Sequence, residues 1–418
     1  MISRIKVRVL AALLLTAAAP LAAQAIDAGT QKRIDRVLEQ TPLIDGHNDL
    51  PDALRDNYRL DVEGTDLSAG TDKLAKPLQT DIARLRQGRV GAQFWSVYVT
   101  SSVPGPEAVK RTLEQIDVVK RLVAKYPRDL ELATTAADIV RIHRDGRIAS
   151  LMGAEGGHQI DNSLGVLRQY YALGVRYLTL AHFKNNDWAD SATDDPVHGG
   201  LTPFGERVVR EMNRIGMIVD LSHVSPATMR AALRVSYAPV IFSHSDVRAL
   251  NDHPRNVPDD VLRQLPGNGG VVMINFYPPH LSAASLAREA AKDGEEARLK
   301  TLYQGQPERR AETLKAWEAA NPRPRVTVAA VANHIEHVVK IAGIDHVGIG
   351  GDLDGVPFAV EGLGSVDGYP LVFVELIRRG WSDAALAKLA GGNILRVMRA
   401  VEAKAASLKN MPPGQGAP

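Results

Sequence analysis

The sequence predicts an α/β fold, a (β/α)8 TIM barrel with an extra helical excursion after the seventh strand. Eight short segments rich in Val, Ile, Leu, Phe and Tyr recur along the chain, and longer stretches of helical character separate them. Near-continuous apolar runs of this length are typical of strands buried on both faces, as in a parallel sheet. A doubly wound open sheet is the alternative, but no G-x-G-x-x-G motif follows any predicted strand.

Each predicted strand is a short apolar run, and each predicted helix has an amphipathic pattern. The strands are expected at residues 43–49, 92–99, 148–155, 177–182, 217–223, 240–244, 270–277 and 346–352. The clearest helices are expected at residues 107–125, 163–173, 204–215, 225–235 and 327–342. Residues 278–325, between the last two strands, are charged and rich in Ala, which predicts the additional helices of the excursion.

The start of the chain has the three-part layout of a secretory signal peptide. Three basic residues precede an apolar run at 9–19, and Ala23-Gln24-Ala25 provides an A-x-A cleavage site. The run is short for a membrane span of about 20 residues. We therefore expect a signal peptide over residues 1–25, one barrel domain over 26–408 and a disordered tail over 409–418.

The composition excludes several functional classes. The 418 residues are 45% hydrophobic and 23% charged, which is typical of a globular protein. The 50 basic and 48 acidic residues become 47 and 48 once residues 1–25 are removed, so the basic excess of a nucleic-acid-binding protein is missing. The chain has no Cys, which excludes disulfides, thiolate metal sites and cysteine nucleophiles. We expect a periplasmic or secreted bacterial protein with no membrane anchor after signal cleavage.

Polar residues gather where the predicted strands end. In a barrel enzyme the active site forms at the C-terminal ends of the strands. Four of the 12 histidines lie at such ends, together with three carboxylates. In chain order these residues are His47, Asp49, Glu155, His182, His223, His244 and Asp352.

Five of these residues form a set that fits a pair of zinc-like ions. His47 and Asp49 share one face of a strand, and Glu155, flanked by Gly156 and Gly157, has two oxygens that can bridge two metals. Two later strands end in Ser-His, at His223 and His244. Each motif alone is also typical of polar loops or buried structural histidines, but three imidazoles and two carboxylates together match zinc chemistry.

The charge balance of such a site indicates hydrolysis. Two divalent ions bring four positive charges, and Asp49 and Glu155 return two negative ones. The residual positive charge would lower the pKa of a shared water, so that hydroxide is available near neutral pH to attack a carbonyl. The residues alone therefore predict a hydrolase.

The chain also resembles the zinc-dependent membrane (renal-type) dipeptidases over nearly all of its mature length. The segments that support this resemblance are Leu43-Ile44-Asp45-Gly46-His47-Asn48-Asp49, Gln93-Phe94-Trp95-Ser96-Val97-Tyr98, Glu155-Gly156-Gly157-His158, Trp188-Ala189-Asp190-Ser191, Phe242-Ser243-His244-Ser245, Arg255-Asn256-Val257-Pro258-Asp259-Asp260 and Gly350-Gly351-Asp352-Leu353-Asp354-Gly355.

The resemblance implies two Zn²⁺ per subunit on the five-residue set, with Glu155 bridging them. It implies that His182 contacts the substrate and its carbonyl, and that Arg255 binds the substrate carboxylate. Asp352 matches the acid/base carboxylate, which also touches substrate; Asp354 is the rival for this role, and we favour Asp352 because it directly ends the apolar strand. The resemblance also implies a homodimer, which must be non-covalent in a chain without Cys.

These observations predict a zinc-dependent dipeptidase that hydrolyses free dipeptides, including those with a C-terminal D-residue. His158 and Asp220 are expected to have supporting roles only. One alternative is another metal-dependent amidohydrolase on the same barrel, such as a D-amino-acid amidase, lactonase or deaminase. The other is a periplasmic peptide-binding protein without turnover.

Overall fold

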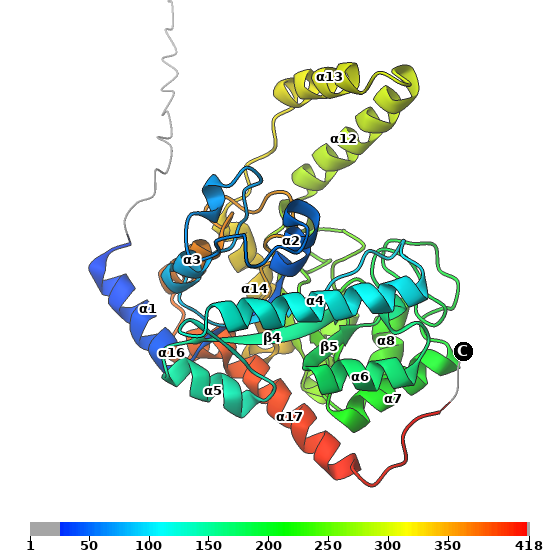
Figure 1. Ribbon diagram of the computed structural model, residues 1–418. Coiled ribbons are helices and arrows are strands. Elements are labelled where there is room, and N and C mark those ends of the chain that lie inside the picture. Colours follow the sequence, from blue (N-terminus) through cyan, green and yellow to red (C-terminus); the bar gives the residue numbers. More distant parts are fainter. Residues whose placement is uncertain (1–25, 416–418) are drawn as a thin grey trace, which may run out of the picture.

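The structure, a computed structural model, describes residues 26–415, which form a closed barrel of parallel strands surrounded by helices (Figure 1). The strands of the barrel are β1 (Leu43–Asn48), β2 (Val90–Ser96), β4 (Ile148–Glu155), β5 (Val175–Thr179), β6 (Ile218–Asp220), β7 (Ile241–Phe242), β8 (Val271–Ile274) and β9 (Val347–Ile349). The predicted (β/α)8 barrel is confirmed. The signal peptide expected over residues 1–25 lies outside the described residues.

The sheet closes because β2, at one end of the strand order, pairs with β4. The strand order is β2-β1-β9-β8-β7-β6-β5-β4-β3, and β2 also pairs with β4, with Ala92 opposite Ala149. The short strand β3 (Leu130–Leu132) pairs in parallel with the first residues of β4 and stands outside the ring of eight. A closed barrel brings the C-terminal ends of all eight strands to one mouth.

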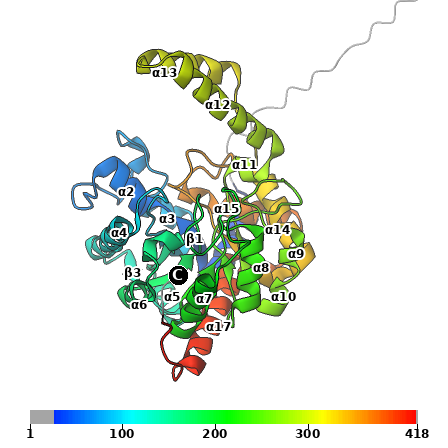
Figure 2. The same ribbon diagram turned by 90° about the vertical axis from the view of Figure 1, so that its right-hand side faces the viewer.

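Helices cover the outside of the barrel (Figure 2). They are α1 (Ala28–Gln40), α2 (Leu50–Tyr58), α3 (Ile82–Gln87), α4 (Gly105–Lys125), α5 (Ala136–Arg144), α6 (Leu164–Leu173), α7 (Pro203–Ile215), α8 (Pro226–Val235), α9 (Asp259–Leu262), α10 (Leu265–Asn268), α14 (Val328–Ala342), α15 (Tyr369–Arg378), α16 (Asp383–Ala387) and α17 (Asn393–Leu408). Local sequence sets their ends. The Thr202 hydroxyl accepts from the Gly205 N–H before α7, and Gly216 ends that helix in the left-handed conformation.

Alternate residues along the strands fill the inside of the barrel. Ile44, Phe94, Leu151 and Met273 belong to one buried cluster, which also contains apolar residues of α17. A second, larger cluster holds the residues that face the outer helices, such as Leu178. The two clusters explain why the strands are apolar on both faces.

β4 ends at Glu155 as predicted, but the other strands of the barrel end earlier than the apolar runs predict, so several polar residues lie in the turns that follow. His47 and Glu155 are strand residues, whereas His223 and Asp352 lie three residues beyond β6 and β9. The backbone of His223 has φ 66° and that of Asp352 has φ 60°, which a β-ladder cannot accommodate. The sharp turns aim both side chains into the barrel mouth.

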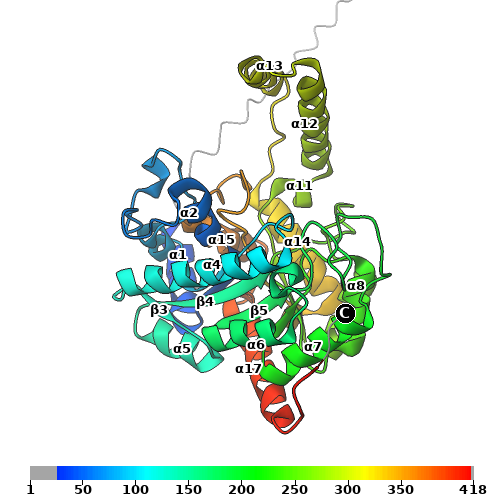
Figure 3. The ribbon, with the colours of Figure 1, turned by 45° about the vertical axis from the view of Figure 1, so that its right-hand side comes forward.

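The predicted excursion is present and leaves the body of the barrel (Figures 1 and 3). It consists of α11 (Pro278–Leu281), α12 (Ala283–Leu302) and α13 (Pro307–Ala320). At the other end of the chain, the Gly414 N–H donates to Glu211 Oε2 at 2.9 Å, and residues 416–418 lie outside the described residues. Disorder of the 409–418 tail stays a prediction. Within 26–415, no helix combines the length and apolar character needed to cross a bilayer.

Candidate metal centre and its cavity

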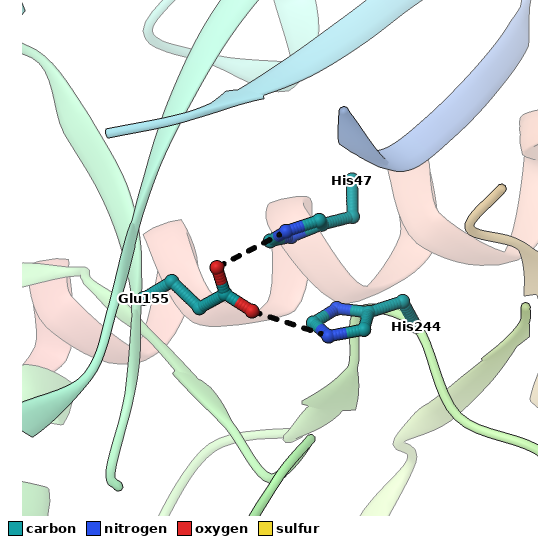
Figure 4. Close-up of side chains that lie close together, drawn as sticks. All are labelled: His47, Glu155 and His244. Atoms are coloured by element: carbon teal, nitrogen blue, oxygen red, sulfur yellow. Dashed lines mark ion pairs between the residues drawn. The ribbon is translucent and has the colours of Figure 1, made fainter. Parts of the chain in front are cut away.

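The carboxylate of Glu155 is the point at which side chains from four strands meet. His47 Nε2 lies 3.3 Å from Glu155 Oε2, while His223 Nε2 and His244 Nε2 lie 3.0 and 3.3 Å from Oε1. The two oxygens are therefore shared between different imidazoles, as Figure 4 shows for His47 and His244. All four side chains are buried. This is the arrangement that a bridging carboxylate requires.

Further donors extend the cluster on both sides of Glu155. His47 Nε2 lies 3.1 Å from Asp49 Oδ2, and His182 Nε2 lies 3.6 Å from Glu155 Oε1. The ligand atoms form three groups, each with all its atoms within 4.8 Å of one another: His47, Glu155 and His244; Glu155, His182 and His223; His47, Asp49 and Asp352. All seven residues predicted from the strand ends thus lie together, whereas His158 adds no atom to these groups among the described residues.

The phenol of Tyr177 orients the imidazole of His47 from below. Tyr177 OH lies 2.8 Å from His47 Nδ1 and donates to the Gly46 carbonyl at 3.2 Å. Since the hydroxyl proton is used on that carbonyl, Nδ1–H of His47 is the donor to the phenol oxygen, and Nε2 keeps its lone pair. Gly153 makes room for this arrangement, because a Cβ there would overlap the Tyr177 ring.

A chain of hydrogen bonds orients the imidazole of His244. Its Nδ1 lies 2.9 Å from Ser243 Oγ, which donates to Asp220 Oδ2 at 2.7 Å. Thr179 Oγ1 donates to the same carboxylate oxygen at 2.5 Å. Nδ1–H of His244 is therefore the donor, and Nε2 keeps its lone pair, which faces His223 Nε2 at 2.8 Å. The supporting role expected for Asp220 corresponds to this chain.

Burial and charge leave these groups in the protonation states that a metal needs. Burial lowers the pKa of His223 and of His244 well below the ordinary value, so both are neutral. Burial alone would raise the pKa of Glu155, but the imidazoles around it, His47 first, hold it well below its usual range. Metal ligands must be neutral imidazoles and ionised carboxylates.

The pKa of His47 is raised, whereas those of His223 and His244 are lowered. Burial lowers the pKa of His47, but Tyr177, Glu155 and Asp49 together raise it well above the ordinary value. The groups that favour a proton on this imidazole would equally favour a divalent cation beside it. Two atoms here, His47 Nε2 and Asp49 Oδ1, are buried without a hydrogen-bond partner in the described structure. Nitrogen and carboxylate donors without thiolates, with such unpaired atoms, fit zinc-like ions.

The centre lies at the floor of a cavity of about 580 Å³. Arg255, predicted to bind a substrate carboxylate, lines this cavity and is only 3% exposed. Its Nη2 donates to the His244 carbonyl at 3.4 Å, while Nη1 is buried without a partner among the described residues. A buried guanidinium with an unused donor is suited to a carboxylate ligand.

Asp352 and Asp354 both line the cavity but have different partners. Asp352 Oδ2 accepts from Asn275 Nδ2 at 2.8 Å, and Asp352 belongs to the donor group with His47 and Asp49. Asp354 Oδ1 accepts from the Gln79 backbone N–H at 2.6 Å, and the Asp354 N–H donates to Gln79 Oε1 at 2.5 Å. Burial is the main cause that raises the pKa of Asp352 to about 8 and that of Asp354 to about 6.

Sequence reasoning missed several residues of the site. Tyr177 is the first residue of the strand predicted at 177–182 and the middle residue of β5, where only the inward direction of its side chain marks it as functional. Tyr98 contacts the His182 ring edge-on at 4.8 Å between centroids. Asp52 and Asp56 lie on α2 and line the cavity, and burial, followed by Asp49 and Asp56, raises the pKa of Asp52 to about 8. The spacing of Asp49, Asp52 and Asp56 at i, i+3 and i+7 was the available signal.

Comparisons with known proteins agree with this site. The family model described as membrane dipeptidase, peptidase family M19, matches residues 31–412. An uncharacterized dipeptidase of Schizosaccharomyces pombe is 43% identical over 387 residues, which cover 89% of this chain and 84% of that protein. The crystal structure of the probable dipeptidase PvdM from Pseudomonas aeruginosa has a TM-score of 0.77 and 26% identity, covering 91% of this chain and 100% of its own.

A further structure shares the fold at lower identity. It is a metallopeptidase from Rhodobacter sphaeroides, solved with a phosphinate mimic of the dipeptide L-Ala-D-Ala. Its TM-score is 0.70 at 21% identity, and the match covers 87% of this chain and 99% of that one.

Removing the Ser243 hydroxyl should weaken metal binding without removing a metal ligand. In Ser243→Ala, His244 Nδ1 loses its acceptor, so the imidazole is free to take the wrong tautomer and orientation. We expect zinc affinity to fall about 10- to 100-fold, measured by competition with a chromophoric chelator. The control is Ser245→Ala, which removes an equally buried hydroxyl that bonds to Ser222 Oγ. Equal affinities for wild type and Ser243→Ala would contradict the orienting role.

Proposed function

The chain belongs to the membrane dipeptidase family, peptidase family M19, and we propose that it hydrolyses free dipeptides with two zinc ions bound around Glu155. The observation that supports this most is the convergence of neutral imidazoles on one buried carboxylate, in a cavity that also holds an unpaired guanidinium. Family membership favours this activity over a lactonase, a deaminase or a peptide-binding protein without turnover.

The ions would be held by residues on both sides of the bridging carboxylate. His47 and Asp49 would serve one ion, His223 and His244 the other, and Glu155 both. When bound, the two ions supply Lewis acidity, which polarises a peptide carbonyl and lowers the pKa of a water molecule. Tyr177 and Ser243 keep the Nε2 atoms of His47 and His244 directed at the ions through the hydrogen bonds described above.

Two residues would hold the dipeptide in place. Arg255 Nη1, which has no partner among the described residues, would bind the free C-terminal carboxylate. His182 would donate to the carbonyl oxygen of the scissile bond, because burial lowers the pKa of this imidazole to about 3 and keeps it a neutral donor. Binding of the terminal carboxylate by Arg255 would place the last peptide bond of the substrate over the metal centre, and we propose that dipeptides with a C-terminal D-residue are also accepted.

Asp352 would move the proton between water and the leaving amine. One of its oxygens is fixed by Asn275, which leaves the other free beside the donor group that contains His47 and Asp49. Asp354 is less suited because it belongs to none of the donor groups, although its Oδ2 is likewise without a partner among the described residues. Asp352 therefore has both the position and the free oxygen that a general base and acid needs.

The activity should depend on metal and on the free carboxylate of the substrate. Purified protein should hydrolyse L-Ala-L-Ala and L-Ala-D-Ala, lose this activity after dialysis against a chelator, and regain it with two equivalents of Zn²⁺. L-Ala-L-Ala amide should be a poor substrate, because Arg255 then has no carboxylate to bind. Full activity in metal-free protein, or hydrolysis of N-acyl amino acids or lactones but of no dipeptide, would contradict the proposal.

Substituting each of the two aspartates by asparagine in turn tests which one transfers the proton. Asp352→Asn should lower kcat at least about 100-fold while zinc content, measured by plasma emission spectroscopy, stays at two per chain. Asp354→Asn is the matched control and should change kcat by less than tenfold. The reverse order of the two effects would assign the role to Asp354.

Export and assembly remain part of the proposal. The signal peptide expected over residues 1–25 favours a periplasmic or secreted bacterial enzyme, so the mature protein should begin at Ile26. Intact mass of the exported protein checks this, and a mass that includes residues 1–25 would contradict it. The non-covalent homodimer stays a prediction, which sedimentation of the mature protein tests.

A further inference from the structure

The cavity contains more acidic groups than the metal centre uses. Six carboxylates line it against the single guanidinium of Arg255. Three of them belong to the donor groups, and a fourth, Asp354, is bound by the Gln79 backbone. The two that remain are Asp52 and Asp56, which lie four residues apart on α2 and so share one face of that helix.

Neither of these two carboxylates is paired with a basic side chain among the described residues. Asp52 Oδ1 accepts one hydrogen bond, from Gln115 Nε2 at 3.2 Å, and is half-buried, while Asp56 is exposed. Arg55, on the same helix, points to Glu114 instead, with Nη1 3.0 Å from Oε2. Within residues 26–415, no Lys, Arg or His nitrogen lies within 4.0 Å of either carboxylate. Two carboxylates without basic partners in a binding cavity favour a cationic ligand.

The geometry indicates which part of a dipeptide meets this wall. Arg255 follows β7 and α2 follows β1, and in the barrel β9 and β8 separate those two strands. The two walls therefore lie on different sides of the mouth, and the charge of Glu155 acts on both Arg255 and Asp52. A substrate whose carboxylate is bound by Arg255 and whose peptide bond lies over Glu155 extends its N-terminal residue toward α2.

The wall beside Arg255 has a different character. His253, Tyr277 and His280 line it, with the two imidazole rings 4.4 Å apart. Burial lowers the pKa of His253 to about 4 and that of His280 well below its ordinary value, so both rings are uncharged. The C-terminal residue of the substrate thus meets neutral rings, and only the N-terminal residue meets free acids.

We propose that Asp52, assisted by Asp56, selects dipeptides whose N-terminal residue has a cationic side chain, such as lysine or arginine. The inference rests on the proposed dipeptidase function and names its preferred substrate class. Asp52 is the specificity-determining residue, because it is the more buried of the two carboxylates. Solvent therefore screens its attraction to a cationic side chain less.

The test compares Lys-Ala with norleucine-Ala, which has the same aliphatic stem without the charge. Wild-type enzyme should have at least about tenfold higher kcat/KM for Lys-Ala. Asp52→Asn should reduce this ratio about tenfold, through KM for Lys-Ala, and leave norleucine-Ala within about twofold. Ala-Lys, whose cation lies at the other end, should be unaffected. Zinc content should stay at two per chain, which separates a specificity effect from damage to the centre.

Two further variants make the outcome decisive. Asp117→Asn removes an exposed carboxylate from the neighbouring helix α4, outside the cavity, and should leave the ratio unchanged. Asp52→Lys should reverse the preference, so that Glu-Ala is hydrolysed faster than Lys-Ala. Equal rates for Lys-Ala and norleucine-Ala in wild type, or equal losses for both in Asp52→Asn, would overturn the inference and leave the dipeptidase function intact. No hydrolysis of any dipeptide would overturn the proposed function itself.

Discussion

The buried carboxylate of Glu155, with imidazoles on both of its oxygens, is the constraint on which the rest of the site depends. An ionised carboxylate in an apolar interior costs several kcal/mol unless cationic or donor groups compensate it. Here the nearest nitrogens belong to His223, His47 and His244, at 3.0 to 3.3 Å, and the raised pKa of His47 shows how strongly the carboxylates attract positive charge to this point. The two divalent cations that we propose would compensate this carboxylate from both sides. The barrel makes the cluster possible, because only a closed sheet brings the ends of β1, β4, β6 and β7 to one place.

Side chains inside the barrel also orient the imidazoles that would bind metal. Tyr177 and Asp220 are strand residues that lie below the donors among apolar neighbours, and their hydrogen bonds set the tautomers of His47 and, through Ser243, of His244. Gly153 accepts the Tyr177 ring where any Cβ would overlap it. The fold and the chemistry are therefore linked through particular buried atoms, so that a change two layers below the cavity should alter metal affinity.

Much of the fold and of the donor set could be predicted from the sequence, since apolar runs mark buried strands and polar residues at their ends must meet at the barrel mouth. Two properties could not be predicted in this way. The turns at His223 and Asp352 depend on left-handed backbone conformations that the apolar pattern does not reveal, so the strands were expected to run too far. The contrast between Asp352 and Asp354 depends on Gln79, which is remote in sequence and meets Asp354 only in the folded chain.

The proposed mechanism requires Glu155 to bridge two metal ions. Anomalous diffraction at the zinc edge, from crystals of the zinc-loaded protein, tests it most directly. We expect two strong peaks per chain, one on the side of His47 and Asp49 and one on the side of His223 and His244, with a Glu155 oxygen beside each. A single peak per chain, or two peaks of which one lies away from Glu155, would contradict it.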